Sequence, residues 1–360
     1  MKNQAYKVSI NRRITKEVKI GETLIGGPNP ILVQSMTKSS SISAIIKEIN
    51  ILESIKCEII RIAVPDFKTA RAIKKIKKET SIPVVADIHF NYRLAIESIE
   101  NGADKIRINP GNIGGKEKVK AVINCANEHN IPIRVGINSG SLEKHLLTKY
   151  GSPVADALVE SAEIWVKTIE DMGFDKIVLS IKSSDTLETI MAYRKISSKI
   201  DYPLHLGITA ASGGDIGIVR SSVGIGTLLA EGIGDTIRVS LTGTSVEEVK
   251  IGYEILKTLS LRENNIQIVA CPTCGRCQID VLKLVNKIEK ELNKIGYKPK
   301  SATKIAVMGC VVNGPGEAKD ADFGITGGKG EGIIFKKGKI IKKVLEKNIV
   351  SVLMEEICKE

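Results

Sequence analysis

Four cysteines in the C-terminal third have a spacing that could hold a metal centre. Cys271, Cys274 and Cys277 form a C-x-x-C-x-x-C motif, and Cys310 follows in the stretch MGCVVNGPGE. Thiolates with two residues between them, here including a proline and a glycine, can reach one metal from a single turn, and a distant cysteine can complete the site. Residues 1–20 contain no continuous apolar stretch. We therefore expect a protein that is not exported, with reduced thiols that bind metal instead of forming disulfides.

Zinc and an iron–sulfur cluster both fit this pattern. A zinc ribbon normally has a second C-x-x-C or C-x-x-H pair, whereas Cys310 lies between Gly309 and Val311. A ferredoxin motif would need a fourth cysteine where Val281 stands. Three cysteines with one ligand of another type would leave a chemically distinctive iron, which favours catalysis over simple electron transfer. The remaining cysteines occur singly in helical stretches and are expected to be small buried residues: Cys57, Cys125 and Cys358.

Positive and polar residues recur at alternate positions in or just after short β-branched runs. Asp87 is the one obvious carboxylate of these runs. Alternate residues of a strand share a face, so His89 lies with Asp87, Ser240 with Arg238, and Asn138 with Arg134 through Gly136. Unpaired charges inside a barrel are costly, and arginine forks suit phosphate, so we expect a strongly anionic, doubly phosphorylated small molecule to bind there. The five cations are Arg61, Arg107, Arg134, Lys182 and Arg238.

Two alternatives concern single residues of this set. Any one arginine could instead pair with a helix carboxylate outside the barrel. A lone strand histidine such as His205 is more often a satisfied core residue, whereas His89 follows Asp87 on the same face.

Eight β-branched runs, each followed by a stretch with helical spacing, organise the first two thirds of the chain. Eight βα units over about 250 residues predict a closed (β/α)₈ TIM barrel of the α/β class. An open doubly wound sheet is the main alternative, but no G-x-G-x-x-G turn follows the first run. The runs are residues 31–36, 59–64, 83–88, 105–110, 132–137, 176–181, 203–208 and 236–241.

The alternation of strand and helix patterns ends near residue 260. We place a polar boundary at residues 261–267 and expect two domains, a substrate-binding barrel over 1–262 and a smaller α+β domain over 263–360 that contains the cysteine motif.

Composition restricts the function further. Hydrophobic residues make up 42% and charged residues 26% of the 360 residues, which is ordinary globular usage, and about eighteen apolar residues never run together. The net charge is +12, which suits an anionic ligand or an acidic protein partner, although solvated lysine-rich helices account for part of it. Aromatic residues make up only 4%, too few for a single-strand nucleic-acid binder. We expect no nucleic acid and no membrane as partner.

Long motifs in this chain resemble the 4-hydroxy-3-methylbut-2-enyl diphosphate synthases, reductive enzymes of the methylerythritol phosphate route to isoprenoids, in their short two-domain bacterial form. They occur in the family's order and cover nearly the whole chain. Among them are QSMT (34–37), ADIHFNYRLA (86–95), GADKIRINPGNIG (102–114), IPIRVGINSGSLE (131–143), LSIKSSD (179–185), GIGDTIRVSLT (232–242), CPTCGR (271–276) and GCVVNGPGEAKDADFGITGG (309–328).

The resemblance implies one [4Fe–4S] cluster per chain, held by Cys271, Cys274, Cys310 and Glu317. Glu317 is the candidate catalytic residue, because a carboxylate leaves iron more easily than a thiolate. Cys277 stands where relatives usually have threonine and matches no family ligand. The residues implied to bind the cyclic diphosphate substrate are Arg61, Asp87, His89, Arg107, Arg134, Asn138, Lys182, Arg238 and Ser240.

The implied reaction is a two-electron reductive opening of 2-C-methyl-D-erythritol 2,4-cyclodiphosphate with loss of water. The resemblance also implies reduced flavodoxin or ferredoxin as electron donor, a homodimer and a cytoplasmic location. Two stretches depart from the family pattern: QSMTKSSS replaces QSMTNTDT, and HLGITAAS replaces HLGVTEAG, with Ala210 at the glutamate position.

Two other classes remain open from the residues alone. One is a non-redox barrel transferase or aldolase with a structural zinc site. The other is a basic nucleic-acid-binding protein with a zinc ribbon.

Overall fold

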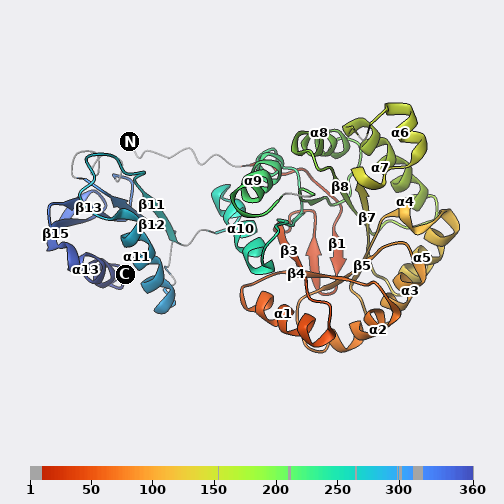
Figure 1. The fold of residues 1–360 in the computed structure, drawn as a ribbon, viewed down its shortest axis with the longest axis horizontal. Helices are drawn as coiled ribbons and strands as arrows, with labels where there is room; N and C mark the ends of the chain where they lie inside the picture. The colour runs from red at the N-terminus through yellow and green to blue at the C-terminus, as the bar shows by residue number, and fades with distance from the viewer. Residues whose placement is uncertain are drawn as a thin grey trace. The chain divides into compact units, whose positions relative to one another are not determined.

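The chain folds as two compact units, Met1–Arg262 and Glu263–Glu360 (Figure 1). The structure, a computed structural model, describes residues 10–152, 154–209, 212–263, 266–297, 299, 302–310 and 319–359. None of the helices in these ranges is long and apolar enough to cross a lipid bilayer.

Eight parallel strands form the sheet of the first unit, in the order β8-β7-β6-β5-β4-β3-β10-β9. A parallel bridge between Leu179 and Leu204 joins β8 to β9 and closes the sheet. The TIM-barrel prediction is confirmed, and one strand falls on each of the eight runs, with β7 and β8 extending one residue beyond theirs. The strands are β3 (Leu32–Met36), β4 (Ile59–Ala63), β5 (Val84–Ile88), β6 (Lys105–Ile108), β7 (Ile133–Asn138), β8 (Ile177–Lys182), β9 (His205–Leu206) and β10 (Thr236–Ile237).

Helices cover the outside of this sheet (Figure 1). Short polar side chains begin several of them; for α10, Thr244 and Glu247 form a reciprocal capping box. The main helices are α1 (Ile42–Ser54), α2 (Phe67–Ile76), α3 (Tyr92–Glu100), α5 (Lys116–Glu128), α7 (Ala155–Glu170), α8 (Thr186–Ser197), α9 (Gly214–Ala230) and α10 (Ser245–Thr258). Shorter turns, α4 (Pro110–Ile113), η1 (Ser139–Ser141) and α6 (Lys144–Tyr150), follow β6 and β7.

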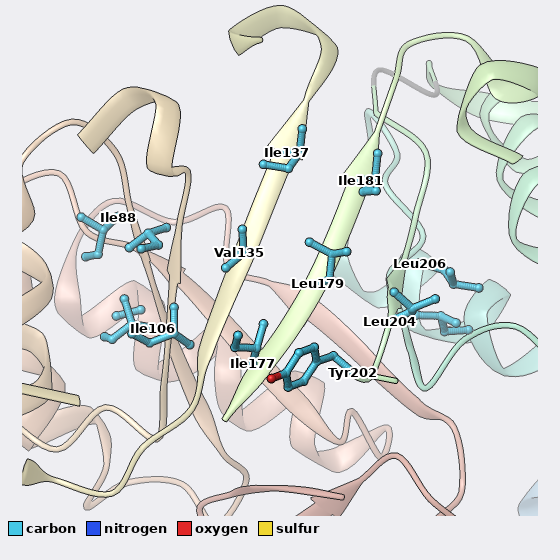
Figure 2. Packing of buried hydrophobic residues seen from close by; sticks show 14 of the residues in the cluster. Ile88, Ile106, Val135, Ile137, Ile177, Leu179, Ile181, Tyr202, Leu204 and Leu206 are labelled. Carbon is cyan, nitrogen blue, oxygen red and sulfur yellow. The ribbon is translucent and has the colours of Figure 1, made fainter. Parts of the chain in front are cut away.

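The outward faces of the strands are apolar and pack under the helices. Figure 2 shows Val135 and Ile137 of β7 beside Leu179 and Ile181 of β8, all buried in the main core. Because side chains alternate along a strand, the residues between them face the barrel lumen. The packing of the outer layer therefore fixes which polar residues point inward.

A short hairpin, β1 (Val18–Ile20) and β2 (Thr23–Ile25), precedes the barrel and was not anticipated from the sequence. Its apolar face, Val18, Ile20 and Ile25, forms a buried cluster with the first lumen residues of four strands. Those residues are Leu32, Ile59, Val85 and Val178. The cluster seals the N-terminal end of the lumen, so a ligand must enter at the opposite end.

The second unit is a five-stranded sheet with helices. Its strands are β11 (Ile266–Ala270), β12 (Thr303–Met308), β13 (Phe323–Gly328), β14 (Glu331–Lys336) and β15 (Lys339–Leu345), in that order. The first three are parallel and the last two antiparallel. Apolar stripes of α11 (Val281–Lys294) and α13 (Ile349–Ile357) complete its core. Cys57 and Cys125 are buried as expected, but the expectation for Cys358 was wrong, since it follows the last turn of α13 and is exposed.

Candidate active site

Asp87, on the lumen face of β5, is the carboxylate around which two arginines gather. Its Oδ1 lies 3.1 Å from Arg107 Nη1, and its Oδ2 lies 3.5 Å from Arg61 Nε. Burial alone would raise the pKa of Asp87, but the charges of Arg61 and Arg107, with the His89 ring 3.7 Å away, hold it well below its usual range. Asp87 is therefore a fixed negative charge at neutral pH.

Lys182 lies among the arginines at the end of β8. Burial and the nearby charges of Arg61, Arg134, Arg238 and Arg107 lower the pKa of its ammonium well below the ordinary value. The structure thus brings together all five cations that the sequence singled out. The lumen end where the strands terminate is strongly positive and suited to a polyanion.

Glu248 is a second counter-charge that the sequence analysis missed. It lies in the first turn of α10, is 1% exposed, and approaches Arg238 Nη2 at 3.2 Å. Alternation along strands could not identify it, because Glu248 lies on a helix. The T-S-V-E-E start of that helix was the available signal, because carboxylates in a first turn often reach back to neighbouring loops.

Two glycines on the lumen side make room for the long cations. A Cβ atom on Gly136 of β7 would lie 2.5 Å from Arg107 Nε, and one on Gly207 would lie 2.5 Å from Lys182 Nζ. A side chain at either place would displace the cation that crosses it. The glycines therefore determine where Arg107 and Lys182 lie.

The remaining expected site residues lie near the mouth. His89 is half exposed, with Nε2 3.3 Å from Arg107 Nη1. The amide oxygen of Asn138, with the side chain oriented to satisfy both neighbours, accepts from Arg107 Nη2 at 2.9 Å. Ser240 is half-buried two residues beyond Arg238.

Two polar residues lie deeper in the lumen, Lys105, which the sequence analysis did not single out, and His205, which it did. Lys105 precedes Arg107 by two residues on β6 and is fully buried, and its Nζ has no hydrogen-bond partner among the described residues. Burial and the charges of Arg134 and Arg61 lower its pKa well below the ordinary value. His205 is also fully buried, with Nδ1 2.8 Å from Thr236 Oγ1, and burial lowers its pKa. This position fits the interpretation of His205 as a core residue.

In the second unit, Cys271 and Cys310 lie at the carboxyl ends of neighbouring parallel strands. Cys271 directly follows β11, and Cys310 lies two residues after the parallel neighbour β12. The Gly309 N–H donates to Cys271 Sγ at 3.2 Å, and the Cys277 thiol lies against Gly309 and donates to the Ile279 carbonyl at 3.1 Å. Cys274 is exposed.

These thiols fit a cluster site in part. An N–H···S bond to Cys271 is a contact that stabilises ligating thiolates, and glycine at 309 lets the two segments approach. Among the described residues, no three metal-binding side chains are already assembled in ligating geometry. Glu317, like Ala210, lies outside the described residues.

The fold and the cationic mouth define a TIM-barrel protein built to bind a small polyanion. The chain belongs to the GcpE family: residues 15–253 match the GcpE TIM-barrel domain, and residues 267–359 match the GcpE protein C-terminal domain.

The sequences of two bacterial relatives align with this chain over nearly its full length. A Caldanaerobacter subterraneus protein named 4-hydroxy-3-methylbut-2-en-1-yl diphosphate synthase (flavodoxin) is 56% identical, with 96% of this chain and 97% of that protein covered. A Clostridium acetobutylicum protein of the same name is 55% identical, with 95% and 98% covered. Among solved structures, Yersinia pestis DHPS with a pterine-sulfa conjugate matches with a TM-score of 0.50 at 10% identity, covering 69% of this chain and all of that one. That likeness concerns the fold alone.

Proposed function

We propose that this protein converts 2-C-methyl-D-erythritol 2,4-cyclodiphosphate to (E)-4-hydroxy-3-methylbut-2-enyl diphosphate by two-electron reduction with loss of water, in the methylerythritol phosphate pathway. It is then an iron–sulfur oxidoreductase, and its relatives are named 4-hydroxy-3-methylbut-2-en-1-yl diphosphate synthase (flavodoxin). The observation that carries the proposal is the group of five cations around Asp87 at the barrel mouth, since a diphosphate supplies the missing negative charge.

The barrel unit binds the substrate in this proposal. Arg61, Arg107, Arg134, Lys182 and Arg238 hold the diphosphate and stabilise the phosphate oxygen that leaves the carbon. Asp87 fixes two of these arginines in place. His89, Asn138 and Ser240 complete the contacts as hydrogen-bonding groups near the rim.

The unit 263–360 holds one [4Fe–4S] cluster through Cys271, Cys274, Cys310 and Glu317. The cluster, when bound, supplies electrons one at a time. Glu317 is the catalytic ligand in this proposal, because its carboxylate is exchanged more easily than a thiolate. Cys277 is a neighbour of the site and binds no iron.

The electron donor is reduced flavodoxin, the protein in the relatives' printed names, or ferredoxin, and the reaction takes place in the cytoplasm. Both donors are acidic, so the +12 charge of the chain favours their docking. The reduction rate should fall as ionic strength rises, and a flat response to salt would argue against electrostatic docking.

A homodimer is part of the proposal. Exposed apolar residues lie at helical spacing on two neighbouring helices, Leu187 and Met191 on α8 and Ile216, Val219 and Val223 on α9. A second copy would cover such a surface. Light scattering should give twice the chain mass, and Val219→Lys should reduce it to one chain.

The first experiment is anaerobic purification followed by iron and acid-labile sulfide analysis and turnover of the cyclic diphosphate with reduced flavodoxin. About four irons per chain and product formation would support the proposal. Stoichiometric zinc without iron, in protein never exposed to oxygen, would instead indicate a non-redox barrel. An Arg107→Met variant should keep its iron but bind substrate weakly, which separates the roles of the two units.

A further inference from the structure

Lys38 follows β3 and reaches across to the loop after β10. Its Nζ lies 2.9 Å from Glu248 Oε1 and donates to the carbonyls of Leu241 at 2.9 Å and Gly243 at 2.6 Å. The side chain is 34% exposed, whereas the Glu248 carboxylate is 1% exposed. Lys38 therefore connects two loops at the rim and pairs with a buried carboxylate.

The backbone of Lys38 is held as firmly as its side chain. The N–H groups of Lys38 and Ser39 each donate to Glu48 of α1 at 3.0 Å, and the Ser245 hydroxyl also donates to Glu48. Burial opposes ionisation of Glu48, but these hydrogen bonds outweigh it and lower its pKa. A charged Glu48 thus fixes the start of the Lys38 side chain relative to α10.

Glu248 is shared by two cations. Its Oε2 lies 3.2 Å from Arg238 Nη2, and its Oε1 accepts from the Leu241 N–H at 3.0 Å as well as contacting Lys38. Arg238 keeps a buried Nε without a partner among the described residues. The trio of Lys38, Glu248 and Arg238 has a net charge of one positive unit, whereas Glu248 and Arg238 alone would be neutral.

We propose that Lys38 is a positioning residue for anion binding: it neutralises Glu248 and so leaves the charge of Arg238 available to the diphosphate. The inference rests on the proposed function. It assigns a role to a residue that touches Arg238 only through Glu248. It also explains why a carboxylate can be buried beside a phosphate-binding arginine without cancelling its charge.

The test compares binding of the cyclic diphosphate to anaerobic holoenzyme by calorimetry, with inorganic pyrophosphate as a second probe. Lys38→Met should weaken binding of both by roughly tenfold, the effect of one unit charge at roughly 10 Å in an effective dielectric of about 20. Lys38→Arg should bind within about twofold of wild type, because it keeps the charge. Lys250→Met, which removes an exposed lysine from α10, is the matched control and should bind like wild type.

A charge-restoring double variant separates electrostatics from loop anchoring. Lys38→Met with Glu248→Gln leaves Arg238 as the only charge of the trio, so the net charge equals that of wild type and binding should recover. If the double variant binds as weakly as Lys38→Met or more weakly, the role of Lys38 is only to hold the loops, and the inference is overturned. Wild-type binding by Lys38→Met would overturn it as well.

The two proposals fail in different ways. A wild-type protein that binds pyrophosphate but neither binds nor reduces the cyclic diphosphate would contradict the proposed function. The pyrophosphate series would still decide the role of Lys38 in that case. Thermal unfolding of each variant identifies any loss of binding that comes from misfolding.

Discussion

Replacing Asp87 with asparagine removes the charge that stabilises two buried arginines and keeps the shape of the side chain. Asp87 is 3% exposed and lies within 3.1 and 3.5 Å of Arg107 and Arg61. Removing one partner of a buried ion pair typically costs about 3–5 kcal/mol, because the remaining charge is left uncompensated. Asn138 and His89 still contact Arg107 but carry no negative charge. We therefore expect Asp87→Asn to lower the free energy of unfolding by about 3–5 kcal/mol.

The assay is urea unfolding followed by tryptophan fluorescence in a buffer free of phosphate and sulfate. Trp165 is the only tryptophan of the chain and lies in α7, so its signal reports the barrel unit. Pyrophosphate should stabilise the variant more than the wild type, because the anion supplies the charge that the mutation removed. Asp201→Asn is the control: its pair with Lys16 is 59% exposed on the Asp201 side and should contribute less than about 1 kcal/mol.

The sign of the pH dependence follows from the lowered pKa of Asp87. A carboxylate with a depressed pKa in the folded state contributes stability above its unfolded pKa of about 3.9, and this contribution is lost as the pH falls toward the folded value. The difference between wild type and Asp87→Asn should thus be constant above about pH 5 and shrink in acid. A difference below about 1 kcal/mol at pH 7, or equal stabilisation of both proteins by pyrophosphate, would refute the reasoning.

Three further outcomes can be checked. Cys277→Ser should retain the iron content of wild type while Cys271→Ser loses it; loss of iron in the first variant would make Cys277 a ligand. The pKa of His205 is lowered in the folded protein, so near pH 6.5 only the unfolded chain takes up its proton. The free energy of unfolding should therefore rise with pH through that range, by up to about 1.4 kcal/mol per pH unit. His205→Gln should flatten this slope, as measured by urea midpoints between about pH 5.5 and 7.5. Lys105→Met should raise the free energy of unfolding by about 1–3 kcal/mol, because it removes a buried amino group without a described hydrogen-bond partner. A destabilised variant in the fluorescence assay would mean that the amino group has a partner in solution.

The barrel was predictable because its signal is repeated. Each of the eight runs is a short β-branched segment followed by an amphipathic helix. Parallel strands that are buried on both faces require such apolar segments, and the helices that cover them require one apolar face. The inward cations were predictable for the same reason: in β7, Val135 and Ile137 face the helices, so Arg134 and Asn138 must face the lumen. The hairpin β1–β2 was missed because strands of three residues leave too little alternation to recognise.

Counter-charges were harder to predict than cations. Asp87 lies on a strand, and its spacing placed it in the lumen. Glu248 and Glu48 lie on helices, and each contacts a neighbour ten residues before it in the chain, Arg238 and Lys38. Their other contacts are long-range: Lys38 pairs with Glu248, and Ser245, 197 residues away, donates to Glu48. Such pairs depend on closure of the barrel between β3 and β10. No local pattern in the sequence encodes that closure.

The charge pattern at the mouth restricts which ligands can bind. Asp87 pairs with Arg61 and Arg107, and Glu248 pairs with Arg238 and Lys38. Arg134 and Lys182, both buried, have no carboxylate within ion-pair distance among the described residues, and burial lowers the pKa of each. Each carboxylate contacts two cations but neutralises only one unit of positive charge. A ligand that enters the mouth therefore meets an excess of positive charge. A neutral or singly charged ligand would leave buried cations uncompensated, whereas a diphosphate restores the charge balance and favours the ionised form of Lys182.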